Sequence, residues 1–194
     1  MPNNDPFARL YQGMLPFHNH FRAEHAQIVR GIPNSQTSPK VSLLRLMQQA
    51  LQLCGHLEMH HTIEEAHIFP LLAKKVPSFA MDSEHIKEHA LMHAQLEALQ
   101  QYSSKVLRDL QSSPGRKAES DGAGQVIKGE DEDDDDVKRK PWPTSLYDEE
   151  QFDTLIKGVA ATLFPHLQAE EASLRPENLK KHGMTLGDIQ RIPM

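Results

Sequence analysis

Apolar positions between residues 46 and 71 recur every three or four residues, which predicts a helix with one face towards a core. Three positions on this face, His60, Glu64 and His67, are polar and therefore point where apolar residues are expected. Burial of such groups is costly unless they are paired or bound to a metal. His61 and Glu65 lie one position off this face. The full stripe is Leu46, Ala50, Leu53, Leu57, His60, Glu64, His67 and Leu71.

Capping residues and prolines set the expected ends of this helix. Ser38 is the expected N-cap and Pro39 the first helical residue. The helix is predicted to reach about Val76, with a kink or break at Pro70, because proline removes one backbone hydrogen bond.

The same spacing predicts three more long helices. One covers about residues 16–32, and the pattern before it is compatible with a short helix over about residues 7–13. Another begins at Asp82 or Ser83, and the last runs over about residues 148–174. Their apolar stripes include His18 and His25 in the first, His85 and His89 in the second, and His166 and Glu170 in the third.

Residues 112–143 differ in composition from the rest of the chain. They contain prolines, glycines and a run of seven acidic residues, followed by three basic ones. Such a segment cannot bury enough apolar surface to order itself, so we predict a disordered insertion. A docking segment for a protein partner is the alternative to a tolerated solvated loop. The predicted domain spans residues 1–176 around this insertion, followed at 177–194 by a short polar tail with room for one turn of helix.

The formal charge of -6 comes from this acidic run, and the rest of the chain is close to neutral. Nothing in it therefore favours binding to nucleic acid. No apolar run is long enough to span a membrane, and the first nine residues lack the apolar core of a secretory signal. The single cysteine, Cys54, excludes an intramolecular disulfide and fits a reducing compartment, so we expect a cytoplasmic protein.

Two predicted helices each carry a histidine and, four residues later, a glutamate: His60 with Glu64, and His166 with Glu170. This spacing puts both side chains on one helix face. One such pair is compatible with a buried histidine that is simply hydrogen-bonded to its neighbouring glutamate. Two pairs, together with inward-facing histidines on the other helices, favour a metal site. Imidazole with carboxylate suits iron, zinc or manganese, and bundle cores are a known place for such sites. His18 matches His60 in its distance from the connecting loop better than His25 does.

In order and placement, these motifs resemble a hemerythrin-like, HHE cation-binding domain. The matching text is His18-Asn-His-Phe-Arg22, His60-x3-Glu64-Glu65-x3-Phe69-Pro70, Glu88-His89-x3-His93 and His166-x3-Glu170-Glu171, within residues 14–112 and 145–176. The resemblance implies an all-α, up-down-up-down four-helix bundle that holds two iron ions. The implied ligands are His18, His60, Glu64, His89, His93, His166 and Glu170. Oxygen-carrying hemerythrins place a carboxylate five residues after the last ligand histidine, so Glu171 is an alternative to Glu170.

The resemblance also implies a non-haem di-iron protein that binds oxygen or a related small ligand, or that senses iron or oxygen. A di-iron oxidase or peroxidase is one alternative, and a metal-buffering interaction module is another. A ferritin-like site needs Glu-x-x-His on two helices. Glu64-x-x-His67 offers one such motif, but the predicted helices that begin near Asp82 and near Asp148 offer none, which argues against the ferritin-like site.

Overall fold

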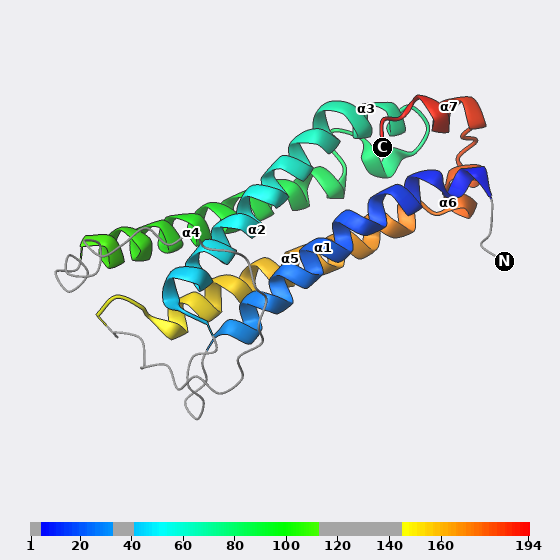
Figure 1. The fold of residues 1–194 in the computed structure, drawn as a ribbon. Helices are drawn as coiled ribbons and strands as arrows, with labels where there is room; N and C mark the ends of the chain where they lie inside the picture. Colours follow the sequence, from blue (N-terminus) through cyan, green and yellow to red (C-terminus); the bar gives the residue numbers. More distant parts are fainter. Residues whose placement is uncertain (1–4, 33–40, 113–144) are drawn as a thin grey trace.

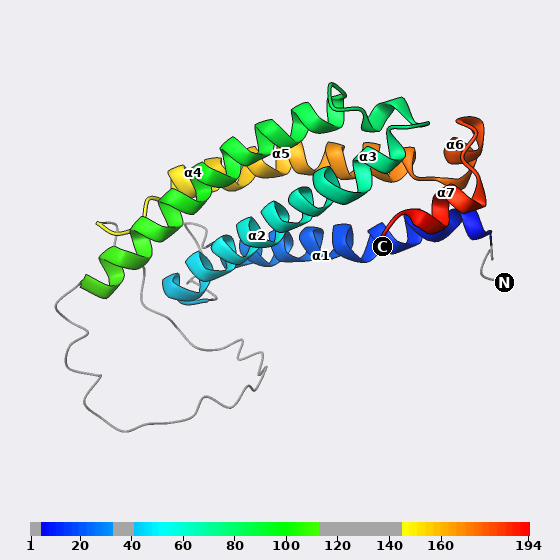
Figure 2. The same ribbon diagram turned by 90° about the horizontal axis from the view of Figure 1, so that it is seen from above.

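The computed structural model describes residues 5–32, 41–112 and 145–194, and this part of the chain is all-helical (Figure 1). Helix α1 contacts α2 and α5, and α4 also contacts α2 and α5, so these helices enclose a shared interior (Figures 1 and 2). The prediction of an all-helical protein is confirmed. The long helices are α1 (Arg9–Gly31), α2 (Leu43–Ile63), α4 (Glu84–Ser112) and α5 (Glu149–Ser173).

Helix α1 begins earlier than the sequence predicts, and Pro16 lies inside it rather than in its first turn. The expected short helix over residues 7–13 is for the most part the start of α1, after the 3-10 turn η1 (Pro6–Ala8). Leu10 and Met14 are almost completely buried in these first turns. Their packing outweighs the hydrogen bond that Pro16 cannot make.

The N-cap of α2 is Ser42, whose hydroxyl accepts a hydrogen bond from the Arg45 N–H. Ser42 directly precedes the buried Leu43, where the apolar stripe begins. The predicted cap, Ser38, and the proline after it lie outside the described residues. The start of α4 agrees with the prediction, and α5 begins as predicted, with Asp148 as its N-cap.

Pro70 does not break the histidine-rich helix. After α2 the chain forms one π turn, η2 (Glu64–Ile68), in which the Phe69 N–H donates to the Glu64 carbonyl. A π turn holds one residue more than an α turn. Pro70, which lacks an N–H, follows in α3 (Phe69–Leu72), so the helical path ends at Leu72 rather than at Val76.

The core has two apolar clusters with a polar layer between them. The larger cluster contains buried residues of all four long helices, including Phe21, Leu57, Met92 and Leu163. The second contains Met14 from α1 and, further along the chain, Ile68, Phe69 and Leu174. Each long helix therefore passes through a layer of buried polar residues, and most of the predicted metal ligands lie in that layer.

The segment after residue 176, predicted as a polar tail, forms α6 (Pro176–Lys181) and α7 (Leu186–Arg191). Its buried residues Leu179, Met184, Ile189 and Ile192 belong to the second apolar cluster. The Arg9 guanidinium donates to the carbonyls of Ile189 (2.7 Å) and Ile192 (3.0 Å), so the start of α1 and the C-terminal segment lie at the same end of the described structure (Figure 2). In the described ranges, no helix has an apolar stretch long enough to cross a bilayer.

Candidate metal centre

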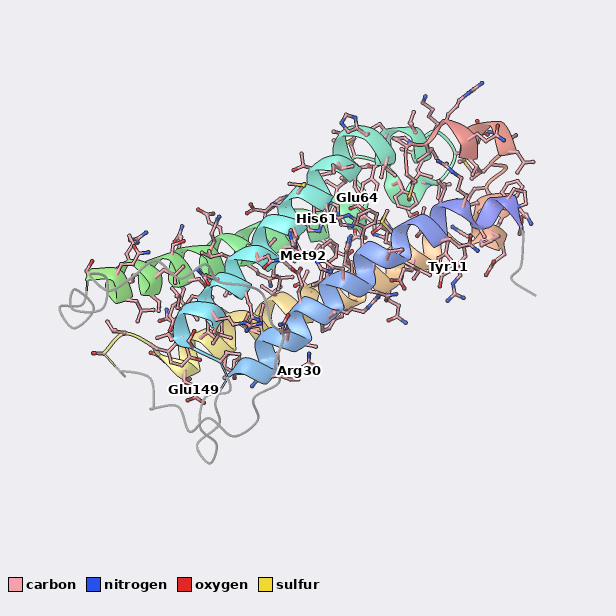
Figure 3. The ribbon with its side chains drawn as sticks, in the orientation of Figure 1. Tyr11, Arg30, His61, Glu64, Met92 and Glu149 are labelled. Atoms are coloured by element: carbon pink, nitrogen blue, oxygen red, sulfur yellow. The ribbon has the colours of Figure 1, made fainter. Side chains whose placement is uncertain are left out.

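The polar layer lies in the interior of the bundle, where each long helix contributes a histidine or a glutamate. His61 and Glu64 are fully buried and lie near the middle of the length of the bundle (Figure 3). None of the layer's central residues is more than 1% exposed. They are His18, His61, Glu64, His89, His166 and Glu170.

One group of candidate ligands is His18, His60, Glu64 and Glu170, whose ligating atoms lie within 4.8 Å of one another. His18 Nε2 is 3.2 Å from Glu170 Oε2, and His60 Nε2 is 3.0 Å from Glu64 Oε1. These atoms make no hydrogen bond within the described residues. Buried polar atoms normally have hydrogen-bond partners. The lone pairs of these nitrogen and oxygen atoms are therefore available to a cation.

A second group is His61, His89 and His166, whose ring nitrogens also lie within 4.8 Å of one another. His89 Nε2 is 3.0 Å from His166 Nε2, and the His61 ring stacks on that of His89 with centroids 4.0 Å apart. Within the described chain, neither ring nitrogen of His61 makes a hydrogen bond. Three converging imidazoles suit a transition metal.

The two buried carboxylates lie between these groups. Glu64 Oε2 is 3.6 Å from His89 Nε2, and Glu170 Oε2 is 3.8 Å from His166 Nε2. Each carboxylate therefore faces histidines of both groups. Each is therefore within reach of a cation held by either group.

The outward nitrogens of three central histidines are each held by a second set of glutamates. Such a bond favours the tautomer with the proton on Nδ1, which leaves the Nε2 lone pair facing inward. Metal-ligating histidines almost always have a partner of this kind. The pairs are His18 Nδ1 with Glu171 (2.9 Å), His89 Nδ1 with Glu65 (2.8 Å) and His166 Nδ1 with Glu88 (2.8 Å).

The two adjacent glutamates of α5, Glu170 and Glu171, have different surroundings and different partners. Glu170 is fully buried between the histidine groups, whereas Glu171 binds His18 and also accepts from Arg22 at 2.8 Å. Glu65 likewise lies outside the layer but holds His89. The two glutamates that the sequence places one position off the stripe are therefore positioning residues for the central histidines.

The electrostatics of the layer favour a bound cation. Burial and the nearby charge of Glu170 raise the pKa of Glu64 well above its ordinary value. Burial would also raise the pKa of Glu170, but the surrounding histidines, His18 foremost, outweigh burial and lower that pKa. Burial lowers the pKa of His60 to about 4 and that of His89 to about 4, so these imidazoles are neutral at pH 7. Neutral imidazole is the form that binds a metal.

The structure brings six of the seven predicted ligands together and leaves His93 apart. His93 is half-buried and belongs to neither group of ligating atoms, although its ring lies 5.6 Å from that of His61. His61 occupies the interior instead. Its signal was present in the sequence, since it follows Leu57 by four residues and precedes Glu64 by three.

Two other histidines lie away from the centre. His67 was predicted to face the core but is exposed, because the extra residue of the π turn brings Ile68 inward instead. His25 is half-buried against Phe164, with ring centroids 5.0 Å apart, in neither group. His18 rather than His25 therefore reaches the centre, in agreement with the distances from the connecting loop.

Comparison with known proteins gives one match. A model of the hemerythrin HHE cation binding domain matches residues 17–121, slightly more than half of the chain. This range includes most of α1 together with α2, η2, α3 and α4, and it ends before α5. No curated protein and no solved structure matches the chain. The chain belongs to the hemerythrin HHE cation-binding domain family.

Proposed function

We propose that this chain is a non-haem di-iron protein that binds oxygen or a related small ligand. The observation that carries the proposal is the pair of histidine groups around Glu64 and Glu170, in which most inward atoms have no hydrogen-bond partner among the described residues. Family membership supports cation binding. The presence of two central groups of candidate ligands, one around His18 and one around His61, supports two ions.

The donors fit iron. His18 and His60 would hold one ion, His89 and His166 the other, and both glutamates would be shared. The geometry favours His61 over His93 as a further ligand of the second ion. Mixed imidazole and carboxylate donors suit iron, with zinc and manganese as alternatives.

When bound, two irons supply redox-active positions at which a small ligand such as oxygen can bind. The protein supplies the surroundings. The apolar clusters on both sides, which include Leu163 and Leu174, keep bulk water out. Glu65, Glu88 and Glu171 keep the imidazoles oriented.

We also infer the up-down-up-down four-helix topology of hemerythrins. In Figure 1 the colours run in opposite directions along successive long helices α1, α2, α4 and α5, which supports this topology. The acidic segment at 112–143 then connects α4 and α5, and most of it lies outside the described residues. Its disorder and its use as a docking segment stay predictions.

Absorption spectroscopy of the iron-loaded protein tests the proposed function. We expect a visible band that changes when oxygen is added and returns when oxygen is removed. Sustained consumption of oxygen with a reductant or peroxide would instead indicate an oxidase or peroxidase. A spectrum that does not respond to oxygen or nitric oxide would contradict small-ligand binding.

A further inference from the structure

A third cluster of metal-binding side chains lies on the surface of the bundle, outside the centre described above. Its members are His20 and Glu24 of α1 and His56 of α2, and their ligating atoms lie within 4.8 Å of one another. His20 is two residues after His18, and residues with this spacing do not face the same side of a helix. His20 and His56 have side chains that are 55% and 40% exposed, so solvent reaches this cluster directly.

The two imidazoles converge on one carboxylate oxygen. Glu24 Oε1 is 3.3 Å from His20 Nε2 and 2.8 Å from His56 Nδ1, and the two rings have centroids 5.4 Å apart. Ligands about 2.0–2.2 Å from a tetrahedral ion lie about 3.3–3.6 Å from one another. The cluster therefore needs only small side-chain shifts to surround a cation.

The glutamate also has an unused oxygen. The Glu24 side chain is only 11% exposed, and its Oε2 is buried without a hydrogen-bond partner in the described part of the chain. Such an atom is costly to bury unless something binds it. A cation shared by His20, Glu24 and His56 would satisfy the carboxylate and neutralise its charge.

We propose that His20, Glu24 and His56 form an additional metal site on the protein surface, which binds a divalent transition cation such as Zn²⁺. The bound cation links α1 to α2. Two imidazoles and one carboxylate are a common zinc ligand set, and water completes the coordination. The exposure of both histidines makes this cation exchangeable with solution. The site is independent of the proposed di-iron function, because it shares no residue with the central groups.

Titration of the iron-loaded full-length protein with Co²⁺, followed by displacement with Zn²⁺, tests the proposal. We expect one Co²⁺ per chain beyond the iron, with the visible bands of a four- or five-coordinate ion. His56→Ala and His20→Ala should each weaken Co²⁺ binding at least tenfold and leave the iron content unchanged. His67→Ala, which removes an exposed histidine of η2, is the matched control and should bind Co²⁺ like the unmodified chain.

The same titration on Glu170→Gln separates the two sites. We expect this variant to lose iron and to keep the Co²⁺ ion that depends on His56. The proposal is overturned if the unmodified chain takes up no Co²⁺ beyond the central site. It is also overturned if His56→Ala and His67→Ala bind Co²⁺ equally well. Binding of Co²⁺ that depends on His56, in a chain that never takes up iron, would support the surface site and contradict the di-iron function.

Discussion

Glu171 shows how much the chemistry of one residue depends on its exact helical position. It is adjacent to the buried Glu170, yet it lies outside the layer and accepts from His18 and Arg22. We expect Glu171→Gln to keep the metal stoichiometry and to weaken affinity about 10- to 100-fold, because the ring of His18 loses its charged partner. Competition with a chelator of known affinity measures this change.

A loss of metal stoichiometry is the contrasting result for Glu171. If Glu171→Gln lost a full equivalent of metal while Glu170→Gln kept it, the ligand on α5 would be Glu171. Glu177→Gln, the same change at an exposed position of α6, serves as the control for an altered surface charge and should leave metal affinity unchanged.

His61 and His93 provide a second test at the scale of single residues. His61 is fully buried among the central imidazoles, whereas His93 is half-buried and outside both groups. We expect His61→Gln to reduce the bound metal, because the second group loses one of its three imidazoles. The matched change His93→Gln should leave the metal content unchanged. Elemental analysis of both variants checks this, and the reverse ranking would favour His93 as the ligand.

Most of the centre was predictable because its residues follow helical spacing. The choice between His61 and His93 was not predictable in the same way. His60 lies on the apolar stripe and His61 one position off it, and the packing of α2 against α4 decides which rings meet. The predicted ligands that the structure brings together are His18, His60, Glu64, His89, His166 and Glu170.

At the scale of elements, the N-cap of α2 can be tested. Ser42 caps the helix by accepting from the Arg45 N–H at 3.2 Å. Ser42→Ala should reduce the free energy of unfolding by about 1 kcal/mol, the usual effect of losing such a cap. Ser42→Asp keeps an acceptor at this position and should leave stability nearly unchanged. Urea unfolding measures both, and equal stability of the alanine variant would place the helix start elsewhere.

The four long helices were predictable from periodicity, but the π turn was not. Pro70 signals a disturbance in the sequence, and an α-helix can respond with a kink, a break or a change of turn. The response depends on tertiary packing. Here Phe69 and Leu72 are fully buried, and the extra residue in η2 lets them pack while Glu64 still faces the centre.

At the scale of the whole molecule, the pH dependence of stability follows from the buried histidines. In the metal-free protein His60 and His89 have pKa values of about 4, below the ordinary 6.5. The unfolded chain therefore binds more protons between these values, and stability falls as the pH decreases from 6.5 towards 4. Each histidine contributes at most about 1.4 kcal/mol per pH unit.

Glu64 acts in the opposite direction in this range. Its raised pKa means that the folded state keeps a proton above pH 4.5 that the unfolded state loses. Its effect on the pH dependence of stability therefore cancels that of about one histidine. We still expect the melting temperature of the chelator-treated protein to decrease from pH 7 to pH 5. A melting temperature that is constant or increases over this range would contradict the neutral, buried state of His60 and His89.

The C-terminal segment shows what only the whole fold determines. Leu179, Met184 and Ile189 are separated by polar residues, and helices of this length are not stable alone. They become ordered because the apolar cluster of α1 and α3, which includes Leu10 and Leu72, offers them a surface. No local pattern in the segment indicates that contact.

The most direct test of the central claim is the number of metal ions per chain, measured by elemental analysis after loading with iron. We predict two irons in the unmodified protein and fewer than two in Glu64→Gln and in Glu170→Gln. Glutamine keeps the shape of each side chain but removes the charge that two neighbouring cations need between them. Full occupancy in both variants, or no stoichiometric metal in the unmodified protein, would contradict a di-iron centre shared by these two carboxylates.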